Sequence, residues 1–167
     1  ADYVICGEGE ITLGELLIAS EAKQSPDDVD GIAYLKNGSV FRTPLRKVLK
    51  DLDTLPFPAW DLVDIDRYKE LWHRHHGYFS MNMVTTRGCP FHCIYCLANQ
   101  VAGTANRYRS VENVIAEIRQ CVEVHGIRNF LYRSDLFTQN ARWVTQLCEA
   151  IVDEKLDIAW ACNARVD

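Results

Sequence analysis

The second half of the chain alternates short apolar runs with longer amphipathic stretches. The runs at 79–86, 130–132 and 158–162 predict three strands. Between the strands, apolar residues recur at helical spacing in two groups, at Val111, Val114, Ile115, Ile118 and Val122 and at Val144, Leu147, Cys148, Ile151 and Val152. Ser110 and Gly126 are well suited to begin and end the first of these helices. The order of strand, loop, helix, strand, helix, strand predicts an α/β fold with a parallel sheet.

The first half has a different pattern. Tyr3-Val4-Ile5-Cys6 is an apolar run that predicts a buried strand. A Gly-Glu-Gly-Glu turn at 7–10 follows it, and Leu13, Leu16 and Leu17 then recur at helical spacing. Asn37-Gly38 lies between two apolar runs and predicts a β-hairpin over 31–41. Two prolines within 55–60 predict a linker without regular structure.

Composition and charge argue against several classes of protein. The 167 residues carry a net charge of −5 and show no basic stripe for a phosphate backbone, so we expect no nucleic-acid partner. No apolar run is as long as a membrane span and no signal peptide is recognisable, which favours a cytoplasmic protein. The chain begins at Ala1 rather than at an initiator Met, and we expect both of its ends to be cut from a longer protein.

Polar residues follow each of the three strands predicted in the second half. A long loop from about Arg87 to Arg109 follows the first strand, Ser134-Asp135 follows the second, and 163–165 follows the third. In parallel barrels the loops after the strands share one face, and the active sites lie there. We therefore expect these three segments to converge on one rim. The unusual length of the first loop also favours a functional role.

The long loop carries three cysteines, Cys89, Cys93 and Cys96, with the spacing C-x3-C-x2-C. Thiolates are soft ligands that suit zinc or iron–sulfur clusters. A structural zinc site could include His92, but this histidine is adjacent to Cys93 and no further ligand pair has zinc-finger spacing. A redox pair of Cys93 and Cys96 would leave Cys89 unexplained. The favoured interpretation is an iron–sulfur cluster on three cysteines, with one iron open to a substrate or cofactor.

The cysteine spacing, the aromatic Tyr95 and the lead-in Arg87-Gly88-Cys89-Pro90 resemble the radical S-adenosylmethionine superfamily. The resemblance implies a full or partial (β/α) TIM-like barrel, with a [4Fe-4S] cluster held by Cys89, Cys93 and Cys96. It implies that S-adenosylmethionine chelates the free iron and is split by an electron into a 5′-deoxyadenosyl radical, which abstracts a hydrogen from a small-molecule substrate. An external electron donor of the flavodoxin or ferredoxin type is implied as well.

The first half resembles the cobalamin-binding subgroup of this superfamily. The resemblance is carried by residues 2–10 with their Gly-Glu-Gly-Glu turn, by the hairpin over 31–41 and by Leu55-Pro56-Phe57-Pro58. It implies cobalamin as a further cofactor, and methyl transfer, ring formation or another rearrangement as the reaction. The implied domains are the end of a Rossmann-like cobalamin domain at 1–45, a linker at 46–77 and the start of the barrel at 78–167. The alternative is a non-catalytic module stapled by zinc or by a cluster.

The resemblance gives roles to further residues, each with an alternative. Tyr95 would lie beside the adenine of S-adenosylmethionine, or else pack beneath the loop. Asp135 would hold the methionine amine, although the local sequence departs from the Gly-Gly-Glu of many relatives and a helix-leading aspartate is the alternative. Arg165 would pair with a carboxylate, or else be solvated. Contacts to cobalamin would come from Gly7, Glu8 and Gly9, whose glycines could instead simply permit a tight turn.

Two remaining groups of possible metal ligands receive structural interpretations. His73, His75 and His76 are interpreted as a polar lead-in to the first barrel strand, because no ligand spacing on a regular element is evident. Seven cysteines without a secretory segment favour metal ligation or buried thiols over disulfides. The cysteines outside the long loop are predicted to be buried small hydrophobes: Cys6, Cys121, Cys148 and Cys162.

Overall fold

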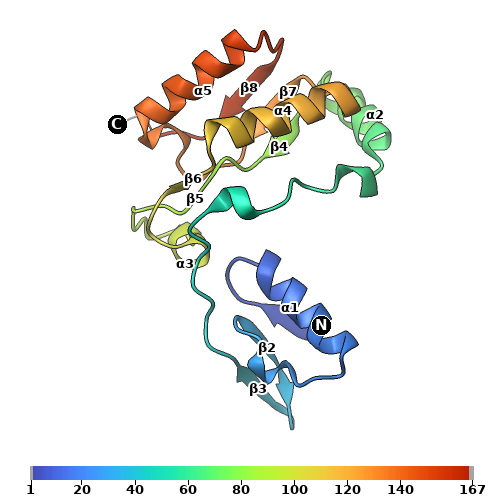
Figure 1. The fold of residues 1–167 in the computed structure, drawn as a ribbon, viewed down its shortest axis with the longest axis vertical. Coiled ribbons are helices and arrows are strands. Elements are labelled where there is room, and N and C mark those ends of the chain that lie inside the picture. The colour runs from blue at the N-terminus through green and yellow to red at the C-terminus, as the bar shows by residue number, and fades with distance from the viewer. Residues whose placement is uncertain (1, 166–167) are drawn as a thin grey trace. The chain divides into compact units, whose positions relative to one another are not determined.

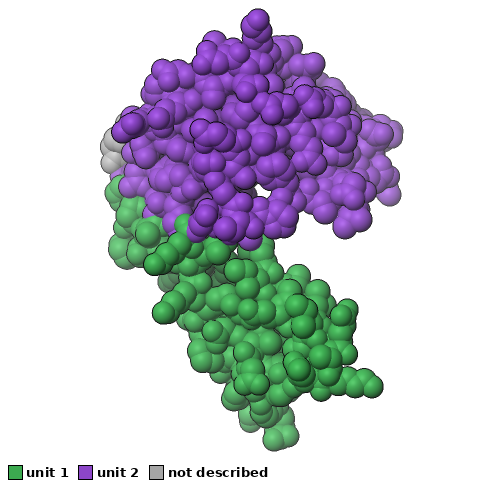
Figure 2. All heavy atoms as spheres, in the orientation of Figure 1, with its two compact units in different colours: residues 1–50, 88–105 green, residues 51–87, 106–167 purple. Residues whose placement is uncertain are grey.

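The computed structural model describes residues 2–165. The chain divides into two compact units, which are described separately (Figure 2). Unit 1 comprises residues 1–50 and 88–105, and unit 2 comprises residues 51–87 and 106–167. The cysteine loop thus belongs to unit 1, while the strands that flank it along the chain belong to unit 2. Within residues 2–165, no helix is long and apolar enough to cross a membrane.

Unit 1 contains an antiparallel sheet of order β1-β2-β3 and one long helix. Its elements are β1 (Tyr3–Ile5), α1 (Glu10–Glu21), the 3-10 helix η1 (Pro26–Asp28), β2 (Ile32–Lys36), β3 (Ser39–Arg42) and α3 (Ala98–Ala102). The predicted hairpin is confirmed, because β2 and β3 pair around Asn37-Gly38. A small core forms where Leu16 and Ala19 of α1 pack with Val29 and Ile32.

The predicted burial of the first strand is wrong, although the strand itself forms. Tyr3 and Val4 are 41% and 54% exposed. Leu13 and Leu17 of α1 are also exposed, so that only Leu16 of the three leucines expected on the apolar face is buried. The physical reason is that β1 is the edge strand of a small sheet with a single long helix, which has too little apolar surface to cover every apolar side chain.

Unit 2 contains the parallel sheet predicted for the second half. The strands β4 (Met81–Met83), β7 (Asn129–Tyr132) and β8 (Ala159–Cys162) lie in the order β4-β7-β8, and both neighbouring pairs are parallel. The helices α4 (Val111–His125) and α5 (Ala141–Asp153) connect them. The hydroxyl of Ser110 accepts the N–H of Asn113 at 3.1 Å, and α4 ends at Gly126, which confirms both predicted helix signals. The shorter elements are η2 (Leu52–Thr54), η3 (Trp60–Leu62), α2 (Ile65–His76), β5 (Thr86–Arg87), β6 (Arg107–Tyr108) and η4 (Phe137–Gln139).

Helices α4 and α5 lie side by side over one face of this parallel sheet (Figure 1). Met81 and Met83 of β4 and Phe130 and Tyr132 of β7 belong to the core that these helices cover, and all four are at most 3% exposed. Because side chains alternate along a strand, the intervening residues belong to the opposite face of the sheet. A pocket of unit 2 lies on that second face.

A helix occupies much of the segment predicted to be a linker. The carboxylate of Asp64 accepts the N–H of Arg67 at 3.1 Å at the start of α2, and Gly77 ends the helix. His73, His75 and His76 lie in the last turn of this helix, and β4 is the next element along the chain. The helix forms because it has a good cap at each end and apolar residues at helical spacing.

Candidate functional site

The cysteine loop emerges from a short antiparallel stem in unit 2. Strands β5 and β6 pair with Thr86 opposite Tyr108 and Arg87 opposite Arg107. Directly below this pair, the N–H of Arg109 donates to the carbonyl of Thr85 at 3.0 Å. The loop therefore leaves the sheet and returns to it at adjacent positions, and the stem fixes both of its ends.

A buried hydroxyl connects this stem to the segment that follows β7. Ser134 Oγ lies 2.7 Å from Thr85 Oγ1 and accepts the N–H of Thr86 at 3.2 Å. All three residues are at most 2% exposed. The segments after β7 and β8 also meet, because the N–H of Phe137 donates to the carbonyl of Asn163 at 3.4 Å. The predicted convergence thus holds for the parts that lie in unit 2, and for the cysteine loop itself it stays a prediction.

Arg109, the residue after β6, is held on several sides. Its Nε donates to Asn113 Oδ1 at 2.6 Å and its Nη1 donates to the carbonyl of Val84 at 3.1 Å. Nη1 also forms an ion pair with the carboxylate of Glu117 on α4. The carbonyl of Arg109 accepts the indole N–H of Trp143 at 2.9 Å. These bonds connect the stem to α4 and α5, and so determine where the loop returns to unit 2.

Within unit 1, the base of the loop leaves no room for a side chain at Gly88. This residue has a φ of +93°, and a Cβ placed on it would lie 2.2 Å from the carbonyl oxygen of Ala105. The next residue, Cys89, donates its N–H to the carbonyl of Gly103 at 3.1 Å. The first predicted cluster ligand is therefore held directly beside the point where the loop closes on itself.

The three loop thiols are free, and none forms a disulfide. Cys89 and Cys93 are half-buried and Cys96 is exposed. A turn in which the N–H of Cys96 donates to the carbonyl of Cys93 at 3.0 Å places two of the thiols on one short segment. Within residues 2–165 no three His, Cys, Asp or Glu side chains are gathered closely enough to hold a metal. Three thiolates are suitable ligands for an iron–sulfur cluster. In this structure, however, the three thiols are not arranged around a common centre.

The residues predicted to contact S-adenosylmethionine lie in both units. Tyr95, in unit 1, is 88% exposed, which excludes the alternative that its ring packs beneath the loop. Asp135 and Arg165, in unit 2, are exposed and lie after β7 and β8 respectively. Asp135 does not cap a helix, because Leu136 precedes η4 and Asn140 caps α5. The roles of these three residues at a cofactor stay predictions.

The predicted cobalamin residues form the turn between β1 and α1. Gly7 has a φ of +92°, which only glycine adopts readily, so a tight turn accounts for this glycine. A carboxylate oxygen of Glu8 accepts the N–H of Leu49 at 2.9 Å, which ties the turn to the end of the first segment of unit 1. A Cβ on Gly7 would lie 3.9 Å from the carbonyl oxygen of Val101 in α3. The turn and the helix after the cysteines are therefore neighbours within unit 1.

The cysteines outside the loop are buried to different degrees. Cys121 is fully buried, as predicted, whereas Cys6, Cys148 and Cys162 are half-buried. Burial, with a smaller contribution from the carboxylate of Glu117, raises the pKa of the Cys121 thiol to about 12. Burial likewise raises the pKa of Cys162 above its ordinary value. These thiols stay protonated near neutral pH, so they are poor nucleophiles and poor ligands.

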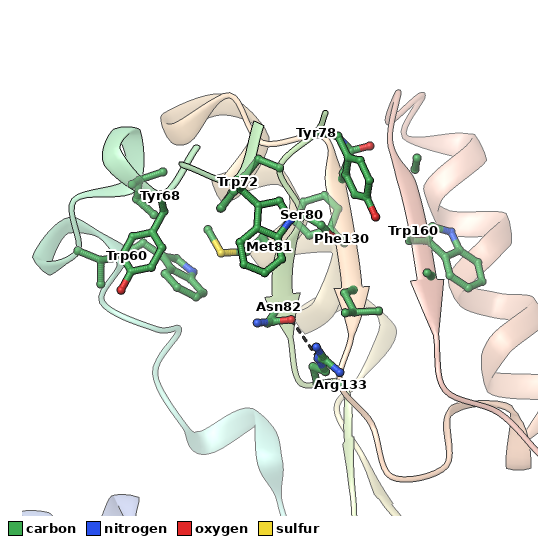
Figure 3. Close-up of a pocket in the computed structure, with 17 residues that line it drawn as sticks. Trp60, Tyr68, Trp72, Tyr78, Ser80, Met81, Asn82, Phe130, Arg133 and Trp160 are labelled. Atoms are coloured by element: carbon green, nitrogen blue, oxygen red, sulfur yellow. Dashed lines mark hydrogen bonds between the residues drawn. The ribbon is translucent and has the colours of Figure 1, made fainter. Parts of the chain in front are cut away.

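Unit 2 contains a pocket of about 540 Å³ that was not predicted from the sequence (Figure 3). Aromatic rings from η3, α2 and the segment before β4 line it together with Asn82 and Arg133. Two sequence signals could have pointed to it. Tyr68 and Trp72 are spaced i, i+4, so they share one helix face, and polar Asn82 interrupts an apolar strand at an alternating position.

No family model matches the chain. The chain is 34% identical over 166 residues to an uncharacterized methyltransferase of Pyrococcus horikoshii, a match that spans 99% of the chain and 35% of that relative. The chain thus spans about a third of the length of this curated relative.

Two solved structures share the fold of the chain. OxsB, a cobalamin-dependent S-adenosylmethionine radical enzyme solved with aqua-cobalamin and S-adenosylmethionine bound, has a TM-score of 0.75 and 20% identity, over 95% of this chain and 22% of its own. TsrM of Kitasatospora setae, a radical S-adenosylmethionine methyltransferase solved with cobalamin and a [4Fe-4S] cluster bound, has a TM-score of 0.68 and 17% identity, over 92% of this chain and 30% of its own. The chain therefore has the fold of part of a cobalamin-dependent radical S-adenosylmethionine enzyme, which is the fold that the resemblance in its sequence implied.

Proposed function

We propose that the chain is the part of a radical S-adenosylmethionine enzyme that holds its iron–sulfur cluster. The observation that carries this proposal is the set of three free thiols, spaced C-x3-C-x2-C, on a loop that follows the first strand of a parallel sheet. Cys89, Cys93 and Cys96 would hold a [4Fe-4S] cluster and leave one iron for the cofactor. When bound, such a cluster supplies the electron for reductive cleavage of S-adenosylmethionine.

The residues around the cysteines would bind and orient S-adenosylmethionine. The exposed ring of Tyr95 offers a stacking surface for adenine, and it lies next to a ligand in the sequence. The carboxylate of Asp135 suits a methionine ammonium group, and the guanidinium of Arg165 suits a carboxylate, because charge-assisted hydrogen bonds are the stronger ones. Both side chains follow strands of the parallel sheet, at the edge where ligands bind in such folds.

The turn of Gly7, Glu8 and Gly9 would contact cobalamin. Within unit 1 this turn neighbours α3, so one compact unit would bring a cobalamin contact near the segment that carries the cluster ligands. We assign residues 1–45 to the end of a cobalamin domain, 46–77 to a linker and 78–167 to the start of the barrel. The linker would include α2.

The reaction that we propose for the whole enzyme starts with hydrogen abstraction from a small-molecule substrate. Methyl transfer is the favoured outcome, because the sequence relative and one of the two structural relatives are methyltransferases. Ring formation is the second outcome considered. A cytoplasmic enzyme reduced by a donor of the flavodoxin or ferredoxin type fits this chemistry.

Anaerobic reconstitution of the chain with iron and sulfide tests the proposal. We expect about four irons and four sulfides per chain, with a charge-transfer absorption band. Cys93→Ala should lose most of the iron and the band. Cys148→Ala is a matched control, because this half-buried cysteine lies on α5 outside the loop and should leave both unchanged.

The alternative of a structural zinc module makes the opposite prediction. Stoichiometric zinc in the chain as purified, with no charge-transfer band after reconstitution, would exclude the radical mechanism. A second measurement concerns the enzyme that contains this chain with its cluster intact. Incubation with S-adenosylmethionine and dithionite should yield 5′-deoxyadenosine, and its absence would leave a cluster-binding protein without this chemistry.

A further inference from the structure

The segment 51–58 lies between the first segment of unit 1 and η3, and it is named the strap here. It contains η2 and the run Leu55-Pro56-Phe57-Pro58. Asp51 Oδ1 accepts the N–H of Asp53 at 3.0 Å at the start of η2, and Leu52 is only 3% exposed. The prolines have a fixed φ and favour an extended backbone in the residues before them. The strap therefore has a defined conformation, although it contains no long helix or strand.

Asp53 of the strap completes the cap at the start of α4. In a capping box, the side chain of the third helical residue accepts the N–H of the cap residue. That third residue is Asn113 here, and its Oδ1 instead accepts Nε–H of Arg109 at 2.6 Å. The two carboxylate oxygens of Asp53 accept the N–H of Ser110, the cap residue, at 2.9 and 3.1 Å. A negative charge is also favourable at this end of a helix, because the helix dipole is positive there.

Phe57 of the strap covers the residue before this cap, Arg109. The guanidinium carbon of Arg109 lies 5.5 Å from the centre of the Phe57 ring, which is within the range of a cation–π contact. Arg109 is buried, so the ring and the ion pair with Glu117 both act on a guanidinium that is largely removed from water. The strap thus contacts Arg109 and Ser110, the two residues directly after β6, through which the cysteine loop returns to unit 2.

The residues just before the strap contact the cysteine loop within unit 1. A Cβ on Gly103 would lie 3.3 Å from Val48 Cγ1, so Val48 packs directly against this glycine. The carbonyl of Gly103 accepts the N–H of Cys89 at 3.1 Å. Next to Val48, the N–H of Leu49 donates to the carboxylate of Glu8 at 2.9 Å. Residues 48–57 therefore contact the loop near its first cysteine and again at its return.

We propose that the strap holds the returning end of the cysteine loop in place, with Asp53 and Phe57 as positioning residues that act through Ser110 and Arg109. Holding the end of a loop in advance lowers the entropy cost of gathering its side chains around a ligand. The cluster should therefore stay bound longer when the strap is intact. This consequence rests on the proposed function, because it requires that the loop hold a cluster. The contacts of the strap do not require a cluster, and they can be tested on the chain without iron.

Amide hydrogen exchange, measured by NMR on the iron-free 167-residue chain, tests these contacts. Asp53→Ala should accelerate exchange at the amide of Ser110 by about tenfold or more, because hydrogen bonds to a charged group are the stronger kind. Asp53→Asn keeps a carbonyl acceptor and should restore much of the protection. Phe57→Leu should accelerate exchange at the amide of Arg109 by about threefold, through loss of the cation–π contact. Unchanged exchange at Ser110 in Asp53→Ala would overturn the proposal.

The rate at which a chelator, bathophenanthroline, removes iron from the reconstituted chain tests the consequence for the cluster. Asp53→Ala should lose iron about threefold faster or more, and Asp53→Asn should lie close to the parent chain. Asp66→Asn is the matched control, because the carboxylate of Asp66 is 92% exposed and pairs only with Lys69 among the described residues.

Urea unfolding of each variant separates positioning from stability. An equal rate of iron loss in Asp53→Ala and the parent chain, or a faster rate that only follows a lower urea midpoint, would overturn the positioning role. A parent chain that holds no iron would contradict the proposed function instead, and exchange at Ser110 would still decide whether the strap holds the return of the loop.

Discussion

Glu117 on α4 and Arg109 beside the stem of the cysteine loop form an ion pair whose side chains are only 2% and 10% exposed. A buried pair of this kind is costly to break, because removal of one charge leaves the other uncompensated in a medium of low dielectric. We expect Glu117→Gln to destabilise the chain by about 3–5 kcal/mol. Urea unfolding followed by circular dichroism measures this loss.

The control for this measurement is the exposed pair of Arg119 and Glu154, whose side chains are 42% and 44% exposed. Glu154→Gln should cost only about 0–1 kcal/mol. The double variant Arg109→Met with Glu117→Leu should recover much of the stability lost in Glu117→Gln, because it removes both charges. Equal costs for Glu117→Gln and Glu154→Gln would contradict the burial of the pair.

Gly88→Ala should impair cluster binding by distorting the base of the loop. The new Cβ would meet the carbonyl oxygen of Ala105, and a positive φ alone costs about 1–2 kcal/mol for an L-residue. Iron and sulfide content after reconstitution should fall while the far-UV circular dichroism stays close to that of the parent chain. Gly14→Ala in α1 is the control, because nothing lies within 4 Å of its Cβ, and it should stabilise the chain by about 0.5–1 kcal/mol.

Ser134→Ala should loosen the stem without a change of charge. The substitution leaves the buried N–H of Thr86 without its acceptor and Thr85 Oγ1 without its partner, at a cost of about 1–3 kcal/mol. Hydrogen exchange at the amide of Thr86 should accelerate more than exchange in α5. Ser39→Ala on an exposed strand should change the stability by less than about 0.5 kcal/mol. Unchanged exchange at Thr86 would show that the hydroxyl does not hold the stem.

Alkaline pH should destabilise the chain through Cys121. The pKa of this thiol rises on folding from its ordinary 9.0 to about 12, so the folded state favours the protonated form. Its contribution to stability is therefore complete below about pH 9 and is lost as the pH rises toward 12. The Tm measured from pH 9 to 11 should fall less steeply in Cys121→Val than in the parent chain. Identical slopes would mean that Cys121 does not titrate on unfolding.

The parallel sheet and its two helices were predictable because their signals are local. Ser110 and Gly126 bracket α4, and the apolar stripes of α4 and α5 match the core that they form. The helix α2 was missed because prolines at 56 and 58 suggested an irregular segment that was extended too far. The burial of β1 was misjudged because burial depends on how many elements surround a strand, which an apolar run does not reveal.

The residues of the candidate site could be predicted only where they belong to a recognisable sequence motif. The cysteines were found from their spacing. Trp72 and Arg133 are 61 positions apart in the sequence, and only the fold brings them into the lining of one pocket. The buried pair of Arg109 and Glu117 was missed for a related reason. Charged residues on a helix are usually solvated, and only tertiary packing shows that Glu117 faces the stem.

Because the two ends of the cysteine loop are paired, the length of the loop can change without moving the strands that carry it. Because Arg87 and Arg107 are opposite each other in an antiparallel pair, the intervening residues begin and end about 5 Å apart. When a hairpin already holds the two ends of a loop together, a longer loop adds little entropy cost, about 0.6 kcal/mol for each doubling of its length. Closure entropy therefore limits the length of this segment only weakly, and residues inserted between β5 and β6 should cost the parallel sheet little.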